Sequence, residues 1–165
     1  MCGISGLFSL NGLSPYRSAL HAANSIAAHR GPDGQGFALF NTRVPVERFV
    51  SLDTGLLPDA STMQSMTLCL GHRRLAIIDL SSTGLQPMTN EDQTLWIVFN
   101  GEIYNFLELR AALEEMGHTF HSQSDTEVIL HAYEAWGEAC VEHFIGMWAF
   151  ALADLQQSLL FCSRD

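Results

Sequence analysis

Residues 147–164 read MWAFALADLQQSLLFCSR, and this stretch decides the class of fold that we expect. Apolar residues dominate both halves, and two polar residues, Gln156 and Gln157, separate them. Runs of this length and composition favour β-strands, and a short polar break between two such runs is typical of a hairpin. Strands joined by a hairpin pair in the antiparallel sense. The stretch therefore predicts local antiparallel pairing.

Further strand-like runs outnumber the helices along the rest of the chain. Alternating or continuous apolar residues mark four of them. These runs cover residues 4–10, 46–52, 68–80 and 94–100. Because consecutive strands tend to pair, this order favours an α+β domain with antiparallel sheets over a doubly wound parallel sheet. The run at 46–52 lies within a longer irregular excursion, 40–66, to which the sequence assigns no function.

Three helices are expected between these strands. Asn105 and Glu108 predict a capping box at the start of FLELRAALEEMG, and Gly117 ends that helix. Ser124 is expected to cap the next helix, which ends at the glycine after HAYEAW. Apolar residues at helical spacing predict the third helix over 18–29.

Composition excludes several classes of partner. The 165 residues are 47% hydrophobic and 16% charged, which suits one domain with a substantial core. Eight Lys and Arg against 18 Asp and Glu give a net charge of -10, which repels nucleic acid and anionic lipid. No apolar run has the length of a membrane span, and the first ten residues lack a secretory pattern. We therefore expect a cytoplasmic protein with neither nucleic-acid nor membrane partners.

The position of Cys2, directly after the initiator methionine, is unusual. A small second residue is the usual condition for methionine removal, so the mature chain would begin with a thiol and a free α-amine. An α-amine with a pKa of about 7.7 to 8.0 can accept the thiol proton near neutrality, so such a residue supplies its own base. Alternatively, Cys2 is a chance residue packed in a strand. The other cysteines, which form no Cys-x-x-Cys pair, are expected to be reduced and inert.

Two glycine-containing motifs offer groups that could hold an anion. In FNGEIYN, Asn100 and Gly101 follow an apolar run, where an amide side chain and an unhindered N–H could stabilise an oxyanion. An ordinary Asn-Gly turn is the alternative. The motif HRGPDGQG either directs N–H groups at an anion or simply reverses the chain, and it lacks the ending of a Walker phosphate loop.

Two charged residues are suited to the ends of a free amino acid. The Arg74 guanidinium suits an α-carboxylate, and the Asp125 carboxylate suits an α-ammonium. A surface ion pair is the alternative for Arg74, and a helix cap is the alternative for Asp125. His118 and His121 have a spacing seen in metal sites, but no third ligand is spaced to join them. We therefore expect no metal.

Several separate motifs occur together and in one order. They are MCGISG, AHRGPDG, GHRRLAIIDLS, QPM, VFNGEIYN, SDTEVILHAY and the final SRD. In this combination the chain resembles the glutaminase domain of glutamine-hydrolysing asparagine synthetases, over nearly its whole length. Other class II glutamine amidotransferases share the leading cysteine and an Asn-Gly, but HRGPDG and NGEIYN resemble the asparagine synthetase branch.

This resemblance implies an N-terminal nucleophile hydrolase fold, a four-layer αββα sandwich with antiparallel sheets. It implies that Cys2 is the nucleophile and that its freed amine is the general base. It further implies an oxyanion hole, a glutamine-binding set and one supporting residue. The oxyanion hole comprises Asn100 and Gly101; the binding set comprises Arg74, Leu75, Ile78, Asn100, Gly101, Glu102 and Asp125; the supporting residue is Arg30.

The implied reaction is hydrolysis of L-glutamine to glutamate and ammonia through a γ-glutamyl thioester. In the family, the ammonia serves ATP-dependent asparagine synthesis from aspartate in a C-terminal synthetase domain or subunit. No cofactor is expected in residues 1–165, and ATP and magnesium are expected only for that synthetase domain. The sequence leaves open whether the chain forms a homodimer.

Two departures from the family pattern shape the remaining alternatives. The excursion at 40–66 is longer than expected. The chain also stops at SRD and contains no pyrophosphate-binding SGG-type loop. We therefore expect an incomplete glutaminase domain, truncated at its C-terminal end, without the synthetase domain. The alternatives are a glutaminase module for a different acceptor and a truncated, non-catalytic domain.

Overall fold

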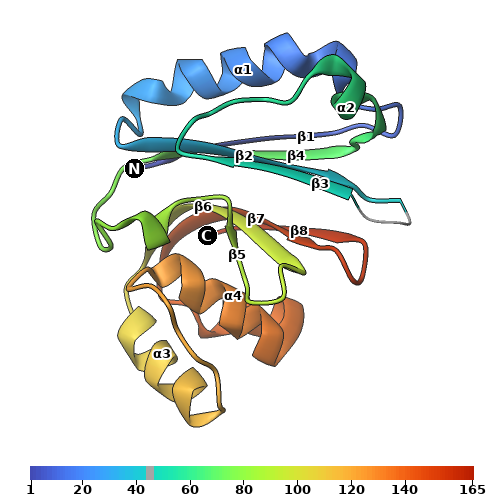
Figure 1. Cartoon of the computed structure of the whole chain (residues 1–165). Helices are drawn as coiled ribbons and strands as arrows, with labels where there is room; N and C mark the ends of the chain where they lie inside the picture. The colour runs from blue at the N-terminus through green and yellow to red at the C-terminus, as the bar shows by residue number, and fades with distance from the viewer. Residues whose placement is uncertain (44–46) are drawn as a thin grey trace. The chain divides into compact units, whose positions relative to one another are not determined.

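The structure is a computed structural model of the chain that describes residues 1–43 and 47–165 (Figure 1). These residues form two compact units. Unit 1 comprises residues 1–75 and 85–87, and unit 2 comprises residues 76–84 and 88–165. Each unit contains a four-stranded sheet whose paired strands are all antiparallel. The expected α+β class with antiparallel sheets is thus confirmed.

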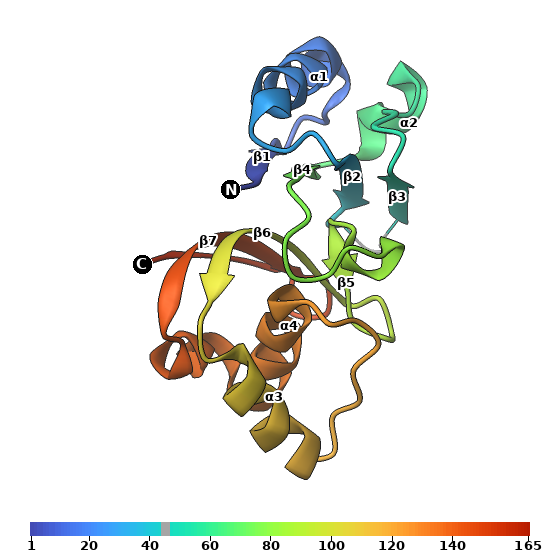
Figure 2. The same cartoon turned by 90° about the vertical axis from the view of Figure 1, so that its left-hand side faces the viewer.

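Unit 1 consists of a sheet with two helices on one of its faces. The strand order is β1-β4-β2-β3. The strands are β1 (Gly3–Phe8), β2 (Gly34–Asn41), β3 (Glu47–Leu52) and β4 (Leu68–Arg74). Figures 1 and 2 show α1 (Arg17–Ile26) and α2 (Ala60–Ser65) on the same side of this sheet. Short 3-10 turns at Ser14–Tyr16 and Ala27–His29 flank α1. Buried side chains of the sheet and helices, including Phe37, Leu39 and Met63, form the core.

Unit 2 pairs its sheet with a buried helix. The strands, in spatial and sequence order, are β5 (Met88–Thr89), β6 (Leu95–Ile103), β7 (Gly146–Asp154) and β8 (Leu159–Arg164). Helix α4 (Asp125–Trp136) packs against β5 and β6, and α3 (Phe106–Glu115) lies beside α4 (Figure 2). Two 3-10 segments, Ser82–Gly84 and Gly137–His143, complete this unit. Its core includes Ile97, Phe99, Val128, Ile129 and Leu152.

The helix ends follow local chemistry in two cases and tertiary contacts in a third. Ser124 caps α4, since its Oγ accepts the Thr126 N–H at 3.2 Å. Gly117 adopts a φ of +100° beyond α3, as its lack of a Cβ permits. The prediction of a capping box at Asn105 is wrong. Although Asn105 precedes α3, its side chain instead bonds His143 O at 3.0 Å and the Ile145 N–H at 2.9 Å.

The predicted strands are present, with shifted ends. The hairpin across residues 156–157 is confirmed as β7 and β8. The strand expected at 46–52 is β3, and position 46 lies outside the described residues. The run at 68–80 forms a strand only to Arg74, whereas β6 continues three residues beyond the predicted end at position 100. Both β2 and α2 were absent from the prediction.

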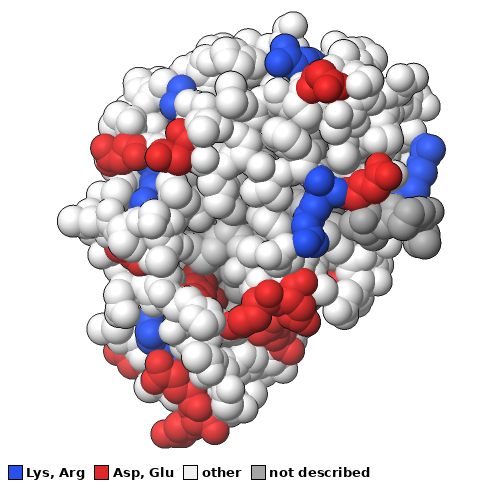
Figure 3. Space-filling view, in the orientation of Figure 1, with Lys and Arg blue, Asp and Glu red and all other residues white. Residues whose placement is uncertain are grey.

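Charge and helix length agree with the sequence. Asp and Glu cover more of the face in Figure 3 than Lys and Arg do, which agrees with the net charge of -10. Within the described ranges, no helix is long and apolar enough to cross a membrane.

Candidate active site

Cys2 immediately precedes β1 and lies beside the end of β4. The register pairs Gly3 with Arg73, so the chain before Gly3 runs past residues 74 and 75. The Sγ of Cys2 accepts the Leu75 N–H at 3.3 Å and lies 3.6 Å from Leu75 O. The thiol is free and half-buried. The Leu75 N–H therefore holds the sulfur in a defined position, as a nucleophile requires.

Arg30 contacts the same residue. Its side chain is exposed, and its Nε donates to Cys2 O at 3.0 Å. The adjoining HRGPDG loop packs directly on β4, because a Cβ on Gly31 would lie 2.4 Å from Arg73 O. The loop is also tied to β4 by the Asp33 N–H, which donates to Arg74 O at 2.9 Å. This motif therefore reverses the chain and brings Arg30 to the backbone of Cys2.

Arg74 is the last residue of β4, and only 7% of it is exposed. The alternative reading of Arg74 as a surface ion pair is therefore wrong. A guanidinium is rarely buried without polar partners, because removing its charge from water is costly. Leu75, which follows it, is half-buried. Cys2, Arg30, Arg74 and Leu75 thus belong to one unit and cluster around the end of β4.

Asn100 and Gly101 lie inside β6, opposite Ala149 and Trp148 of β7. The alternative of an Asn-Gly turn is therefore wrong, as is the expectation that the strand leaves the sheet here. The backbone of β7 approaches Gly101 closely, since a Cβ there would lie 2.2 Å from Met147 O. The buried Oδ1 of Asn100 has no hydrogen-bond partner among the described residues. Leaving such an atom unpaired costs about 1–3 kcal/mol.

The backbone of β6 presents an open edge at these residues. Among the residues that the structure describes, β5 pairs with Trp96 and Ile97 alone, so the segment 98–103 has a sheet partner on the β7 side only. The Tyr104 N–H points to that side and donates to Ile145 O. N–H groups alternate in direction along a strand, so those of Ile103 and Gly101 point the other way. The Gly101 N–H thus faces the open edge.

Asp125 lies at this same edge. Its Oδ2 accepts the Ile103 N–H at 3.0 Å, and the residue is buried. Burial, with a contribution from the charge of Glu102, raises the pKa of Asp125 to about 6. The reading of Asp125 as a simple helix cap is wrong, because Ser124 makes that bond. A carboxylate held in this way gains from pairing with a cation.

Glu102 and Ile78 belong to unit 2 as well, and neither is fully buried. Glu102 is exposed on β6, and Ile78 is half-buried in the segment after β4. Sequence reasoning missed the neighbour of Ile78, Asp79. Although burial opposes its charge, hydrogen bonds from Ser81, Gln123 and Thr83 lower the pKa of Asp79 to about 2. The run of hydroxyl residues after Asp79 was the signal for this turn.

Comparison with known proteins identifies the family. Residues 57–165 match the family described as the glutamine amidotransferase domain. The whole chain is 36% identical to the putative asparagine synthetase [glutamine-hydrolyzing] 2 of Methanocaldococcus jannaschii and covers 30% of that protein. It is also 36% identical to asparagine synthetase [glutamine-hydrolyzing] 1 of Bacillus subtilis and covers 22% of it. The chain therefore spans less than a third of the length of these relatives.

Solved structures support the fold. One is a glutamine phosphoribosylpyrophosphate amidotransferase from B. subtilis, with a TM-score of 0.65 and 21% sequence identity. The match covers 93% of the present chain and 35% of the amidotransferase chain. Another is described as the allosteric regulatory enzyme of purine biosynthesis, with a TM-score of 0.71 and 18% sequence identity. The match covers the whole of the present chain and 37% of the enzyme's chain. The expected N-terminal nucleophile hydrolase fold agrees with these matches and with the two antiparallel sheets.

Proposed function

The chain belongs to the glutamine amidotransferase domain family, and on that premise we propose that it hydrolyses the side-chain amide of L-glutamine with Cys2. It is homologous to the glutaminase domain of asparagine synthetases. The observation that carries the proposal is the setting of Cys2. The thiol is the second residue of the chain, forms no disulfide and accepts the Leu75 N–H at 3.3 Å.

The proposed reaction begins with removal of the exposed Met1, which frees the α-amine of Cys2. That amine takes the thiol proton, and the thiolate attacks the amide carbon of glutamine. The Asn100 side chain and the Gly101 N–H stabilise the tetrahedral oxyanion. The amine then returns the proton to the leaving nitrogen, which departs as ammonia. Water hydrolyses the γ-glutamyl thioester to glutamate and regenerates the thiol.

The remaining residues receive roles in binding. The buried Arg74 guanidinium binds the α-carboxylate of glutamine, and Asp125 with Glu102 binds its α-ammonium. Leu75 and Ile78 contact the aliphatic part of the substrate. Arg30 is a positioning residue, a role supported by its bond to Cys2 O. Hydrolysis by these groups requires no cofactor.

The proposal extends to the whole protein through the functions named for its relatives. We assign residues 1–165 to a class II glutaminase domain that supplies ammonia to a synthetase domain or subunit. There, ATP and magnesium would activate aspartate for asparagine synthesis. Support comes from the asparagine synthetases that match the entire chain at 36% identity.

Measurement of glutamate release from glutamine tests the proposal. The processed protein is expected to turn glutamine over, and Cys2→Ala is expected to abolish turnover. Cys162→Ala is the matched control, because Cys162 is an exposed free thiol on β8 of unit 2. Turnover that survives Cys2→Ala, or its absence from processed and folded protein, would contradict the proposal.

A further inference from the structure

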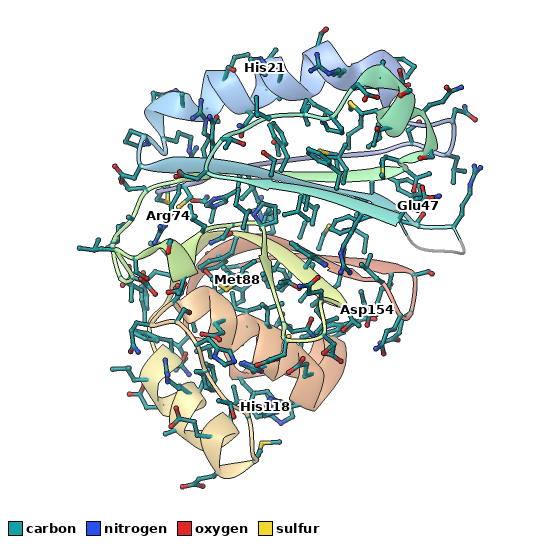
Figure 4. All side chains as sticks on the ribbon, in the orientation of Figure 1. His21, Glu47, Arg74, Met88, His118 and Asp154 are labelled. Atoms are coloured by element: carbon teal, nitrogen blue, oxygen red, sulfur yellow. The ribbon has the colours of Figure 1, made fainter. Side chains whose placement is uncertain are left out.

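A second group of reactive side chains lies in unit 2 and has no role in the proposed glutamine chemistry. His118 lies in the loop between α3 and α4, and Figure 4 shows it beside α4. His131 and Glu134 lie three residues apart on α4. Each of these residues offers one ligand atom, and the three atoms lie within 4.8 Å of one another.

The three atoms form a compact triangle. His118 Nδ1 lies 3.1 Å from His131 Nδ1, and Glu134 Oε2 lies 2.8 Å from His131 Nδ1 and 3.3 Å from His118 Nδ1. Ligands on one tetrahedral zinc ion, at about 2.0 Å from the metal, are about 3.3 Å apart. A point about 2.0 Å from all three atoms lies about 1 Å above the plane of this triangle.

Hydrogen bonds alone satisfy this triangle poorly. Two ring nitrogens in contact require a proton on one and a lone pair on the other. If His131 Nδ1 donates to Glu134, it offers no lone pair to His118. If both nitrogens carry protons, both N–H groups can donate to Glu134 Oε2, and the two donors then lie only 3.1 Å apart without a bond between them. A metal ion accepts a lone pair from each of the three atoms and satisfies all three contacts at once.

A neighbouring side chain orients one of the ligands for this role. Asn90 Nδ2 donates to the second carboxylate oxygen of Glu134 at 2.8 Å. Carboxylate oxygens of Glu91 and Glu127 lie 3.8 and 4.0 Å from His131 Nε2. Both distances are longer than a hydrogen bond, so these two carboxylates act on the site through their negative charge, which favours a cation.

The cluster is accessible from one side. The side chain of His131 is 3% exposed, whereas those of His118 and Glu134 are 20% and 27% exposed. An ion could therefore reach the cluster from solvent past the exposed parts of His118 and Glu134. The surrounding carboxylates also favour a cation.

We propose that His118, His131 and Glu134 bind one divalent transition-metal ion, preferably zinc. Two imidazoles and one carboxylate form a donor set that zinc uses when a fourth position stays open, whereas magnesium and calcium prefer oxygen ligands alone. The ion would tie the loop that carries His118 to α4. The sequence-based expectation of no metal considered His118 with His121, but His121 lies 3.5 Å from Glu91 and outside the triangle.

Competition of the full chain with a chromophoric zinc chelator tests this proposal. The protein is expected to bind one zinc ion per chain, and excess magnesium is expected not to displace it. His118→Gln and Glu134→Gln are each expected to weaken zinc binding about a hundredfold, since loss of even a supporting residue costs about 10–100-fold. Both side chains are partly exposed, so either variant can fold, and circular dichroism verifies this.

Two control variants separate this site from other zinc ligands. His121→Gln changes an exposed histidine near the cluster, and Cys2→Ala removes the thiol of the proposed nucleophile; both are expected to bind zinc as the parent does. Cobalt in place of zinc is expected to show no sulfur-to-metal absorption band. Failure of the parent chain to bind zinc, unchanged binding in folded His118→Gln and Glu134→Gln, or loss of binding in Cys2→Ala would overturn the proposal.

Discussion

The amide of Asn100 is the single side chain on which the proposed oxyanion hole depends. Its amide nitrogen is the donor to the oxyanion in this proposal, and its buried oxygen has no partner in the part of the chain that the structure describes. Loss of one oxyanion donor costs about a hundredfold or more in rate. We expect Asn100→Ala to lower kcat for glutamine by at least this factor while the KM changes little. Steady-state glutamate release measures both constants.

A matched variant checks that the effect is local. Asn11 is an exposed asparagine in unit 1, and Asn11→Ala is expected to leave kcat unchanged. Equal turnover of Asn100→Ala and the parent protein would remove Asn100 from the oxyanion hole.

Asp125 predicts a pH dependence of glutamine binding. Its pKa is raised to about 6, first by burial and then by the charge of Glu102. The carboxylate must lose its proton before it can pair with the α-ammonium of glutamine. Affinity is therefore full well above pH 6 and decreases below it, by about tenfold at pH 5 for a single group with this pKa. Calorimetry on Cys2→Ala measures the Kd without turnover.

The same experiment on a double variant assigns the titration. Cys2→Ala with Asp125→Asn is expected to bind glutamine weakly at every pH from 5 to 8, with no change across pH 6. The Asn oxygen can still accept the Ile103 N–H, so the local structure is retained. A tenfold pH dependence that persists in the double variant would assign the titration to another group.

The chemical identity of these residues could be read from sequence, but their surroundings could not. Cys2 is conspicuous by its position alone. The burial of Arg74 depends on strand pairing in unit 1, which no local pattern reveals. The position of Gly101 inside β6 depends on the approach of β7 at Met147 O. These contacts are tertiary, so residues distant in the sequence determine which alternative applies.

At the scale of elements, the turn that begins at Asp79 connects the segment after β4 to the start of α4. Asp79 Oδ1 accepts the Ser81 N–H at 2.8 Å, and Oδ2 accepts the Gln123 N–H at 3.0 Å. Gln123 lies two residues before Asp125. This buried carboxylate therefore helps to position both Ile78 and the beginning of α4.

Asp79 is expected to stabilise the fold in a pH-dependent way. Its pKa in the folded chain is lowered to about 2 from an ordinary value of 3.8, so the ionised form favours folding. The contribution is present above pH 4 and is lost as the pH falls towards 2. We expect Asp79→Asn to reduce the free energy of unfolding by about 1–3 kcal/mol at pH 6 and by about half as much at pH 3.

Urea unfolding at both pH values measures this difference. Asp92→Asn, at an exposed position of the same unit, is the matched control and is expected to match the parent at pH 6. An effect of Asp79→Asn that is equally large at pH 3 would show that packing, and not charge, explains the stabilisation.

Elements with strong local signals were predictable, and those without them were not. The β7–β8 hairpin follows from the composition of its two strands. Helices α3 and α4 follow from the residues at their ends. Helix α2 has only six residues, too few to show helical spacing, and β2 begins at Gly34 inside a glycine-rich motif. Strand β6 continues past its apolar run because β7 pairs with it to Ile103.

At the scale of the whole molecule, the sequence predicted the fold class from strand order, but function required the family. The assigned residues divide between the units, with Cys2, Arg30, Arg74 and Leu75 in one. Ile78 belongs to the other, although it is only three residues from Leu75. The partner of His118 could not be read from spacing for a similar reason, since His118 contacts His131, a residue 13 positions away.

Intact mass of the purified protein, before and after exposure to a glutamine analogue with an electrophilic diazoketone side chain, tests the central claim most directly. Cys2→Ala and Cys162→Ala serve as controls. We predict loss of Met1 and a single adduct that is absent from Cys2→Ala, retained in Cys162→Ala and suppressed by excess glutamine. Folded, processed protein without an adduct, or an adduct that persists in Cys2→Ala, would contradict the assignment of Cys2 as the nucleophile.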